Sequence, residues 1–208
     1  MAVDIQEIDP YAPHRKQIRY VVAALQAEKV IVYPTDTVYG LGADVLAREA
    51  IRRILHIKGA EEGKLLSFIF NDIKQASRWI HISNSAYKII RRLIPGPYTF
   101  ILPAARQTPH PIFKTRKTIG VRIPDCAVAR GIVEALGRPM VNSSIPTGPD
   151  EVYAEPGRIV ADFKDSIDLF LNGGPLPVIQ STIIDFTEET PRVIREGAGD
   201  ISRFTVPG

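Results

Sequence analysis

The sequence predicts an α/β protein, a single domain with a twisted mixed β-sheet flanked by helices. Short apolar runs that suit buried strands alternate with longer stretches whose apolar residues recur at helical spacing. Near the C-terminus two short apolar segments flank a polar turn, which is the pattern of an antiparallel hairpin. The chain has 208 residues, a length that suits one domain over residues 1–208.

The composition is that of an ordinary globular protein, with 45% hydrophobic and 24% charged residues. The single cysteine, Cys126, excludes an internal disulfide and fits a reducing compartment. The sequence shows neither an apolar signal core nor a run long enough to span a membrane, so we expect a soluble cytoplasmic protein with no membrane partner. The net charge of +3 permits an anionic partner such as RNA or a nucleotide, without requiring one.

The first half of the chain is predicted to alternate helices with strands. Its first helix, 13–29, carries an apolar stripe of Ile18, Val21, Val22 and Leu25. The other predicted elements are strand 30–33, helix 47–59 with a stop at Gly59, strand 65–70, helix 72–80 beginning at Asp72, helix 84–94 beginning at Asn84, and strand 98–103 after the break Pro95-Gly96-Pro97.

The second half begins with a predicted strand, 118–124. Ile119, Val121 and Ile123 alternate onto one of its faces, so Arg122 should point to the other. Asp125 is expected to cap helix 126–136. Strand 139–144, strand 167–174 with its diglycine end, and a hairpin of 181–186 with 192–197 around a five-residue turn complete the predicted elements.

Polar side chains recur where the predicted strands end. In open α/β sheets, ligands bind in the crevice beyond the strand ends. We therefore expect one groove for an anionic, polar ligand, because hydroxyl and guanidinium groups recognise phosphate and carboxylate. Each threonine or serine alone is equally explained as a turn former or a helix cap. The set consists of Thr35, Thr37, Arg122, Ser143, Ser144, Ser181, Thr182 and Arg195.

Two lysines are further candidates for this groove. Lys58 falls in the last turn of a predicted helix, where a lysine also simply complements the helix dipole. Lys64 follows Gly63 and is free to reach a ligand. The basic groups at 114–117 and at Arg91 and Arg92 suit RNA phosphates and equally suit ordinary solvated surface.

No metal site or catalytic nucleophile is predicted. The four histidines, His14, His56, His81 and His110, lack the spacing of metal ligands and are interpreted as surface imidazoles. Cys126 starts a predicted helix, whose dipole lowers a thiol pKa, but no histidine lies near it in sequence, so a packing role is favoured. No P-loop and no G-x-G-x-x-G pattern occurs. Catalysis would then rest on holding reactants together and neutralising their charge.

Six motifs occur in order along the chain: "YPTDTVYGLG", "PGPYTFIL", "TIGVRIP", "NGG", "STIID" and "RVIREG". This ordered set resembles the YrdC-like family. The resemblance extends from the first predicted helix to Gly199. It implies a single α/β domain whose twisted sheet carries a large, basic concave groove.

The resemblance also implies an activity and its site. The best-known members make threonylcarbamoyl-AMP from L-threonine, bicarbonate and ATP, and a partner complex then moves the threonylcarbamoyl group onto tRNA. Magnesium would enter with the ATP. On this basis Thr35 helps to hold threonine, and we add Thr37, Tyr39 and Arg122 to that substrate side. The nucleotide side consists of Lys58, Lys64, Ser67, Ser143, Ser181, Thr182 and Arg195.

Two departures from the synthase pattern resemble the YciO branch of the family. Synthases carry an arginine where this chain has Ala60, followed by Pro-Leu where it has Leu65-Leu66. They also carry an asparagine in a Ser-x-Asn motif where this chain has Ile145. Each departure removes a polar group from the nucleotide side. Loss of one guanidinium–phosphate contact costs roughly 1.5–3 kcal/mol.

Three functions are therefore compared. The first is a threonylcarbamoyl-AMP synthase, slowed by the two departures. The second is a module without synthase activity that binds double-stranded RNA, tRNA or the ribosome through the same basic surface. The third is an enzyme of another carbonyl- or nucleotide-handling class, for which the sequence offers nothing specific.

Overall fold

The computed structural model describes residues 2–59, 66–105, 117–146, 155–177, 179–202 and 204. Its strands are β1 (Asp4–Glu7), β2 (Ile31–Tyr33), β3 (Gly40–Asp44), β4 (Ser67–Ile69), β5 (Tyr98–Pro103), β6 (Thr118–Arg122), β7 (Met140–Ser144), β8 (Leu169–Asn172), β9 (Thr182–Asp185) and β10 (Arg192–Arg195). Its helices are α1 (Arg15–Gln26), α2 (Arg48–Ile57), α3 (Ile73–Ala76), α4 (Asn84–Ile90), α6 (Ala127–Leu136) and α7 (Pro156–Phe163).

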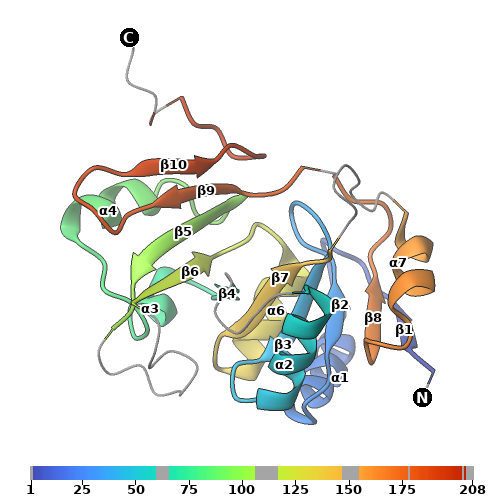
Figure 1. The fold of residues 1–208 in the computed structure, drawn as a ribbon. Coiled ribbons are helices and arrows are strands. Elements are labelled where there is room, and N and C mark those ends of the chain that lie inside the picture. Colours follow the sequence, from blue (N-terminus) through green and yellow to red (C-terminus); the bar gives the residue numbers. More distant parts are fainter. Residues whose placement is uncertain are drawn as a thin grey trace.

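In the described residues these strands form one mixed sheet, in the order β1-β8-β2-β3-β7-β4-β6-β5-β9-β10 (Figure 1). Parallel pairs, such as β4 with β6, stand beside antiparallel pairs, such as β3 with β7. The predicted single α/β domain with a mixed sheet and flanking helices is confirmed.

Helices cover both faces of the sheet, and each face has its own apolar core. On one face α1 and α6 pack against each other, α1 lies against β3 and α6 against β4, and Leu25, Ile132 and Ile31 belong to the same buried cluster. On the other face α2 packs on β3, where Ile54 and Leu41 share a second cluster. Figure 1 shows α2 in front of the sheet at β3 and α6 behind the sheet. The apolar stripe predicted for the first helix is confirmed.

Several predicted element ends are wrong. The N-cap of α4 is Ser83 rather than Asn84, because the Ser83 hydroxyl accepts from the Ala86 amide at 3.2 Å. Asp125 does not cap α6, whose N-cap is Cys126, without a side-chain cap bond. The helix predicted over 72–80 is helical only at Ile73–Ala76. Six residues, 186–191, separate β9 from β10, one more than the predicted turn.

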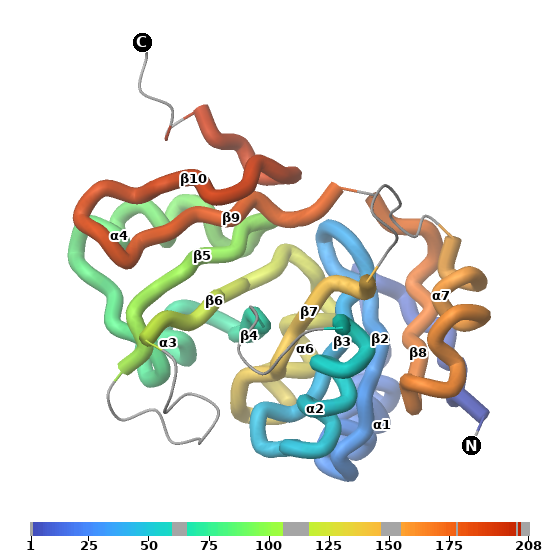
Figure 2. Tube along the Cα trace, viewed as in Figure 1, coloured from blue at the N-terminus to red at the C-terminus, as the bar shows by residue number. Residues whose placement is uncertain are grey.

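The segment between β8 and β9 crosses the molecule. The strands β2, β3, β7, β4, β6 and β5 all lie between β8 and β9 in the sheet. Figure 2 shows the tube passing along one edge of the sheet to reach β9. This path brings residues 179–181 beside strands that are distant from β8. Among the described residues, no helix has the length and apolar character needed to cross a membrane.

Candidate functional site

A cavity of about 310 Å³ lies where β4, β5, β6 and β7 meet the loop after β2. The residue after α2, the two residues before β9 and the last residue of β10 also line the cavity. The lining residues are Thr37, Val38, Lys58, Leu66, Ser67, Thr99, Ile101, Gly120, Arg122, Asn142, Ser143, Ser144, Gln180, Ser181, Ile183 and Arg195.

The cavity is cationic. Lys58, Arg122 and Arg195 line it, and no acidic side chain stands among its described lining residues. Burial lowers the pKa of Lys58, and the charge of Arg195 lowers it further. Burial, and then the charge of Arg122, likewise lowers the pKa of Arg195. Since burial and a like charge disfavour the charged forms of Lys58 and Arg195, an anionic ligand would relieve both costs.

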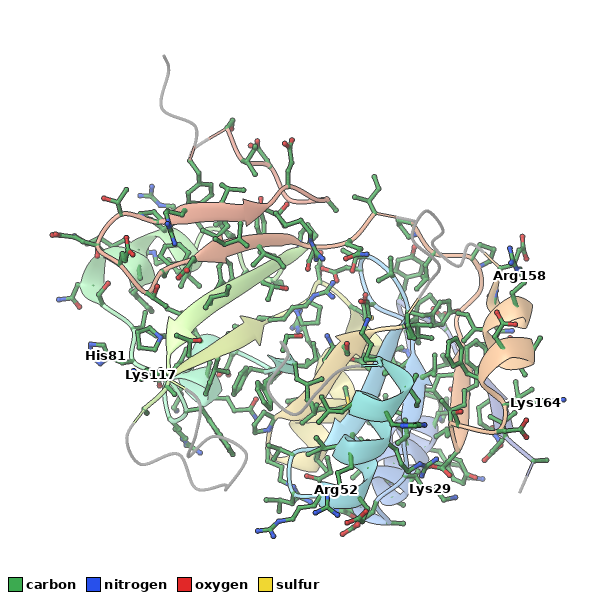
Figure 3. The ribbon with its side chains drawn as sticks, in the orientation of Figure 1. Lys29, Arg52, His81, Lys117, Arg158 and Lys164 are labelled. Atoms are coloured by element: carbon green, nitrogen blue, oxygen red, sulfur yellow. The ribbon has the colours of Figure 1, made fainter. Side chains whose placement is uncertain are left out.

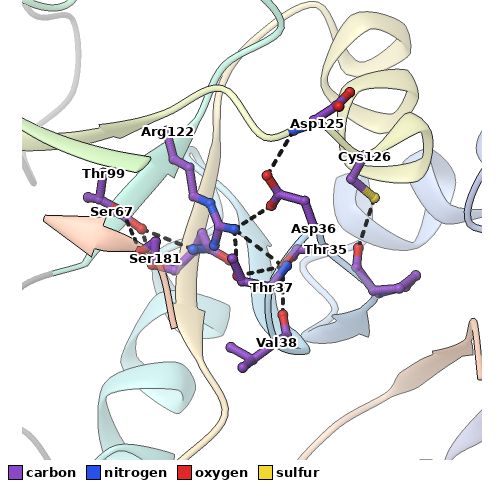
Figure 4. Close-up of polar contacts among 12 residues, drawn as sticks. Thr35, Asp36, Thr37, Val38, Ser67, Thr99, Arg122, Asp125, Cys126 and Ser181 are labelled. Carbon is purple, nitrogen blue, oxygen red and sulfur yellow. Dashed lines mark hydrogen bonds and ion pairs between the residues drawn. The ribbon is translucent and has the colours of Figure 1, made fainter. Parts of the chain in front are cut away.

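Arg122 is anchored from the loop that follows β2. Its Nη2 donates to Asp36 Oδ1 at 2.5 Å and to Thr37 Oγ1 at 2.6 Å, and lies 3.4 Å from Thr35 Oγ1 (Figure 4). The alternation predicted for strand 118–124 is confirmed, because Ile119, Val121 and Ile123 lie in the apolar core while Arg122 lines the cavity. The Nε of Arg122 is buried and has no partner in the described part of the chain.

The loop 34–38 is itself held by several bonds. Thr35 Oγ1 donates to the Val38 carbonyl at 2.7 Å, and Asp36 Oδ2 accepts from the Asp125 amide at 3.0 Å (Figure 4). The Cys126 thiol donates to the Pro34 carbonyl at 3.3 Å. Burial raises the pKa of this thiol. The predicted packing role of Cys126 is confirmed, since its side chain joins a buried apolar cluster.

The opposite wall is built around Arg195. Its Nη2 donates to the Ser181 carbonyl at 2.8 Å and its Nε donates to the same oxygen at 3.1 Å. Its Nη1 donates to Gln180 Oε1. The Ser181 hydroxyl lies 2.9 Å from Thr99 Oγ1. Among the described residues, Lys58 by contrast donates only to the Ser144 carbonyl, at 3.2 Å, which leaves two of its N–H groups for a ligand.

Most of the predicted site residues meet at this cavity. Those that line it are Thr37, Lys58, Ser67, Arg122, Ser143, Ser144, Ser181 and Arg195. Thr35 is buried directly behind Thr37, with 3.1 Å between the two hydroxyl oxygens.

Two predicted residues are placed elsewhere, and one is not described. The Tyr39 hydroxyl donates to the Gly174 carbonyl at 2.7 Å and accepts from the Gly173 amide at 3.0 Å, which fixes the diglycine turn. The Thr182 hydroxyl donates to the Gly199 carbonyl at 2.8 Å and accepts from the Gly199 amide at 2.9 Å. Neither side chain lines the cavity. Lys64 lies outside the described residues, as does Ala60.

Sequence reasoning missed Asn142, Thr99, Gln180 and the anchoring role of Asp36. Thr99 carried a signal, because it alternates with the buried Tyr98 and Phe100 along β5. Asn142 also carried a weak signal, because it belongs to the polar end of predicted strand 139–144. Its Oδ1 accepts from the hydroxyl of Tyr33, which is distant in sequence, at 2.6 Å.

Ile145 cannot take part in the site. Its side chain belongs to the buried apolar cluster, and its amide donates to the Tyr39 carbonyl at 3.3 Å. The asparagine that the synthase pattern has at this position is therefore replaced by a core residue. Asn142, three residues earlier, supplies an amide to the cavity lining instead.

A cationic, hydroxyl-lined cavity on a mixed α/β sheet has the chemistry that suits a small anionic ligand. The family model for Sua5, YciO and YrdC proteins, described as "Telomere recombination", matches residues 23–197. The chain belongs to this family, as its motifs predicted.

Two relatives place the chain within the family. It is 34% identical to YciO of Escherichia coli over 199 residues, which cover 95% of this chain and 97% of that one. The crystal structure of E. coli YciO superposes with a TM-score of 0.91 at 33% identity, covering 98% of this chain and all, 100%, of the other. The predicted similarity to YciO is confirmed.

The second relative is a synthase. The threonylcarbamoyl-AMP synthase of Pyrococcus abyssi is 30% identical over 187 residues, which cover 87% of this chain and 54% of that protein. The crystal structure of P. abyssi Sua5 complexed with L-threonine superposes with a TM-score of 0.83 at 28% identity, covering 93% of this chain and 57% of the other. The chain thus corresponds to little more than half of that synthase.

Proposed function

We propose that the cavity binds L-threonine and ATP and that the protein condenses them with bicarbonate into threonylcarbamoyl-AMP. The observation that carries the proposal is the convergence of Lys58, Arg122 and Arg195 on a cavity with no acidic side chain among its described lining residues. Support also comes from a family that includes a threonine-bound Sua5 and threonylcarbamoyl-AMP synthases. Since these substrates are cytoplasmic metabolites, we place the protein in the cytoplasm.

The proposed chemistry has two steps. The threonine amine attacks the carbon of bicarbonate, and water leaves as a carbamate forms. A carbamate oxygen then attacks the α-phosphorus of ATP, the bond to the β-phosphate oxygen breaks, and pyrophosphate leaves. Arg122, anchored by Asp36, would hold the threonine carboxylate, whereas Lys58 and Arg195 would offset the charge of the triphosphate and of the departing pyrophosphate.

Magnesium enters this scheme as part of the substrate. Among the described residues, no group of three or more histidine, cysteine, aspartate or glutamate side chains is arranged to hold a metal ion. Asp36, which is next to the cavity, is already engaged by Arg122 and by the Asp125 amide. Mg²⁺ would therefore be held chiefly by phosphate oxygens and water, as it commonly is in nucleotide sites.

Slow turnover is expected. Ile145 lies in the apolar core and offers the nucleotide no hydrogen bond. One missing contact to a charged oxygen is worth roughly 1.5–3 kcal/mol, or about a tenfold to hundredfold loss of rate when the contact acts in the transition state.

The test is pyrophosphate release by the purified protein with ATP, and with L-threonine or bicarbonate omitted in turn. We expect release that requires both. Lys58→Met should lower it at least tenfold, while Lys164→Met, an exposed lysine that points outward in Figure 3, should leave it unchanged. Release that is independent of threonine, or absent under every condition including added tRNA, contradicts the proposal.

RNA binding is a second candidate, favoured by the surface of α4. Tyr87 is 42% exposed there, beside the exposed side chains of Lys88, Arg91 and Arg92. An exposed aromatic ring among cations suits a stacked base and its phosphates. The basic groups at 114–116 lie outside the described residues, and Lys117 is exposed (Figure 3).

The partner of this surface would be tRNA or another RNA. Affinity for tRNA and for double-stranded RNA, measured against salt concentration, should fall steeply, with a shallower slope in an Arg91→Gln/Arg92→Gln variant. An affinity that does not change with salt, or no binding at low salt, removes RNA as a partner. Pyrophosphate release in the same variant separates this surface from the cavity.

A further inference from the structure

The side chain of Tyr33 crosses strand β3 over two glycines. Tyr33 pairs with Gly40 in the β2–β3 ladder, and its ring covers both Gly40 and Gly42. A Cβ on Gly42 would lie 2.9 Å from the Tyr33 ring, and one on Gly40 would lie 3.1 Å from it. These glycines leave the space through which Tyr33 reaches β7, the strand beyond β3.

On β7 the Tyr33 hydroxyl donates to Asn142 Oδ1 at 2.6 Å. Tyr33 is fully buried, and burial raises the pKa of its phenol well above the ordinary range, so the hydroxyl keeps its proton. Neither partner has another bond at these two atoms among the described residues. A buried phenol without an acceptor is costly, so Tyr33 selects the amide orientation that turns Asn142 Oδ1 towards it.

The same orientation turns the Asn142 nitrogen towards the cavity. Nδ2 donates to Ser67 Oγ at 2.9 Å, and both Asn142 and Ser67 line the cavity. The Ser67 hydroxyl donates in turn to the Asn142 carbonyl at 3.2 Å. An amide nitrogen carries two N–H groups, and within the described part of the chain only one of them is engaged, so the other can serve a ligand. The opposite orientation would present an oxygen, which repels an anion.

We propose that Asn142 donates a hydrogen bond to an anionic oxygen of the bound ligand, and that Tyr33 is the positioning residue that fixes this donor. The ligand oxygen is a phosphate oxygen of ATP or the carboxylate of L-threonine. The inference deepens the proposed function, on which it rests for these two ligands. It gives the cavity an uncharged donor beside Lys58, Arg122 and Arg195.

If Tyr33 acts on the ligand only through Asn142, the effects of changing the two residues must be coupled. A double-mutant cycle measures this coupling. The variants are Tyr33→Phe, Asn142→Ala and the two combined. Tyr98→Phe is the matched control, since Tyr98 is also buried and its hydroxyl donates to the Asp200 carbonyl at 3.2 Å, away from the cavity lining. Calorimetric titration with ATP, L-threonine and adenosine gives the affinities. Adenosine is the uncharged reference.

We expect Asn142→Ala to weaken one of the two anionic ligands about tenfold to hundredfold, the range for a bond to a charged group. Tyr33→Phe should weaken the same ligand about 3-fold to 10-fold, because only part of the population then holds the amide in the binding orientation. The combined variant should bind like Asn142→Ala alone. Adenosine affinity should stay constant, and Tyr98→Phe should change none of the affinities.

Three results overturn the inference. The first is that the affinity losses of Tyr33→Phe and Asn142→Ala add up in the combined variant. The second is that the variants lose as much affinity for adenosine as for the anions. The third is that Asn142→Ala binds both anions with unchanged affinity. Absence of ATP and threonine binding by the natural protein overturns it together with the proposed function. Binding that follows the expected cycle without pyrophosphate release keeps the inference and removes only the synthase proposal.

Discussion

Asp36 and Arg122 form a buried ion pair at the edge of the cavity. Asp36 Oδ1 lies 2.5 Å from Arg122 Nη2, and their side chains are 10% and 5% exposed. The second carboxylate oxygen of Asp36 accepts from the Asp125 amide at 3.0 Å. One aspartate thus joins the loop after β2 to strand β6 and to the entry of α6. The position of the cavity arginine depends on it.

Asp36→Asn should therefore destabilise the protein strongly. Removing one partner of a buried ion pair leaves the other charge uncompensated, which costs about 3–5 kcal/mol. Urea unfolding measures the loss. Glu49→Gln is the control, because its pair with Arg52 is exposed, with side chains 67% and 64% accessible, and such pairs are worth at most about 1 kcal/mol. Equal losses in the two variants would contradict the structural role given to Asp36.

Gly40→Ala should lower stability by about 1–3 kcal/mol, as overpacked cores do. The new Cβ would lie 2.6 Å from Asn142 Oδ1 and 3.1 Å from the ring of Tyr33. Gly157→Ala is the matched control, because nothing lies within 4 Å of the corresponding Cβ in α7. It should be neutral or stabilising, since alanine favours helix. Thermal unfolding of both variants checks the prediction, and a stable Gly40→Ala protein would show that β3 has space over this glycine.

Lys58→Met should be more stable than the natural protein at neutral pH. Burial and Arg195 lower the pKa of Lys58 below 10.5 in the folded state, so the folded protein holds this proton less tightly than the unfolded chain does. The charged lysine thus opposes folding fully below the lowered pKa, and this cost falls as the pH rises from that pKa towards 10.5, the value in the unfolded chain. The advantage of the variant should shrink accordingly in melting temperatures measured between pH 7 and pH 10.

An anionic ligand should reduce the stability advantage of Lys58→Met over the natural protein. Added phosphate or ATP should raise the melting temperature of the natural protein more than that of Lys58→Met, because the ligand pairs with the buried charge. Lys164→Met, at an exposed position after α7, serves as the control and should respond to the anion like the natural protein. The prediction fails if the two lysine variants respond alike.

Cys126 should resist alkylation in the folded protein. Its thiol is buried, burial raises its pKa, and it donates to the Pro34 carbonyl at 3.3 Å. Because the thiolate is the reactive form, iodoacetamide at pH 8 should modify the chain only after unfolding in denaturant. Mass spectrometry measures the modification of this single cysteine. Rapid alkylation under native conditions would show that the α6 entry opens easily.

Site residues whose placement follows from a local sequence pattern were predictable from the sequence. Alternation along strand 118–124 placed Arg122 opposite its apolar neighbours, whereas Lys58 was assigned to the nucleotide side by the family resemblance. Strand β3 was not predicted, because Gly40 and Gly42 have low strand propensity. The reason for these glycines, the ring of Tyr33, lies on the neighbouring strand.

Long-range partners account for the rest of what was missed. Tyr33 is indistinguishable in sequence from a core strand residue, and Asn142, which accepts its hydrogen bond, lies 109 residues away. Tyr39 and Thr182 belong to the predicted motifs, yet their hydroxyls hold backbone turns at Gly174 and Gly199. A hydroxyl in a motif therefore indicates a structured turn as readily as a ligand contact, and only the pairing of the strands separates the two.

The most direct test of the proposed function is the product itself. The protein is incubated with ATP, magnesium, L-threonine and carbon-13 bicarbonate, and the nucleotides are analysed by mass spectrometry. We predict threonylcarbamoyl-AMP carrying one carbon-13 label, in amounts below those from a family member with the full synthase signature. Lys58→Met should lower the yield and Lys164→Met should not. Consumption of ATP without labelled threonylcarbamoyl-AMP, or no consumption when the protein is folded and binds ATP, would contradict the proposed synthase activity.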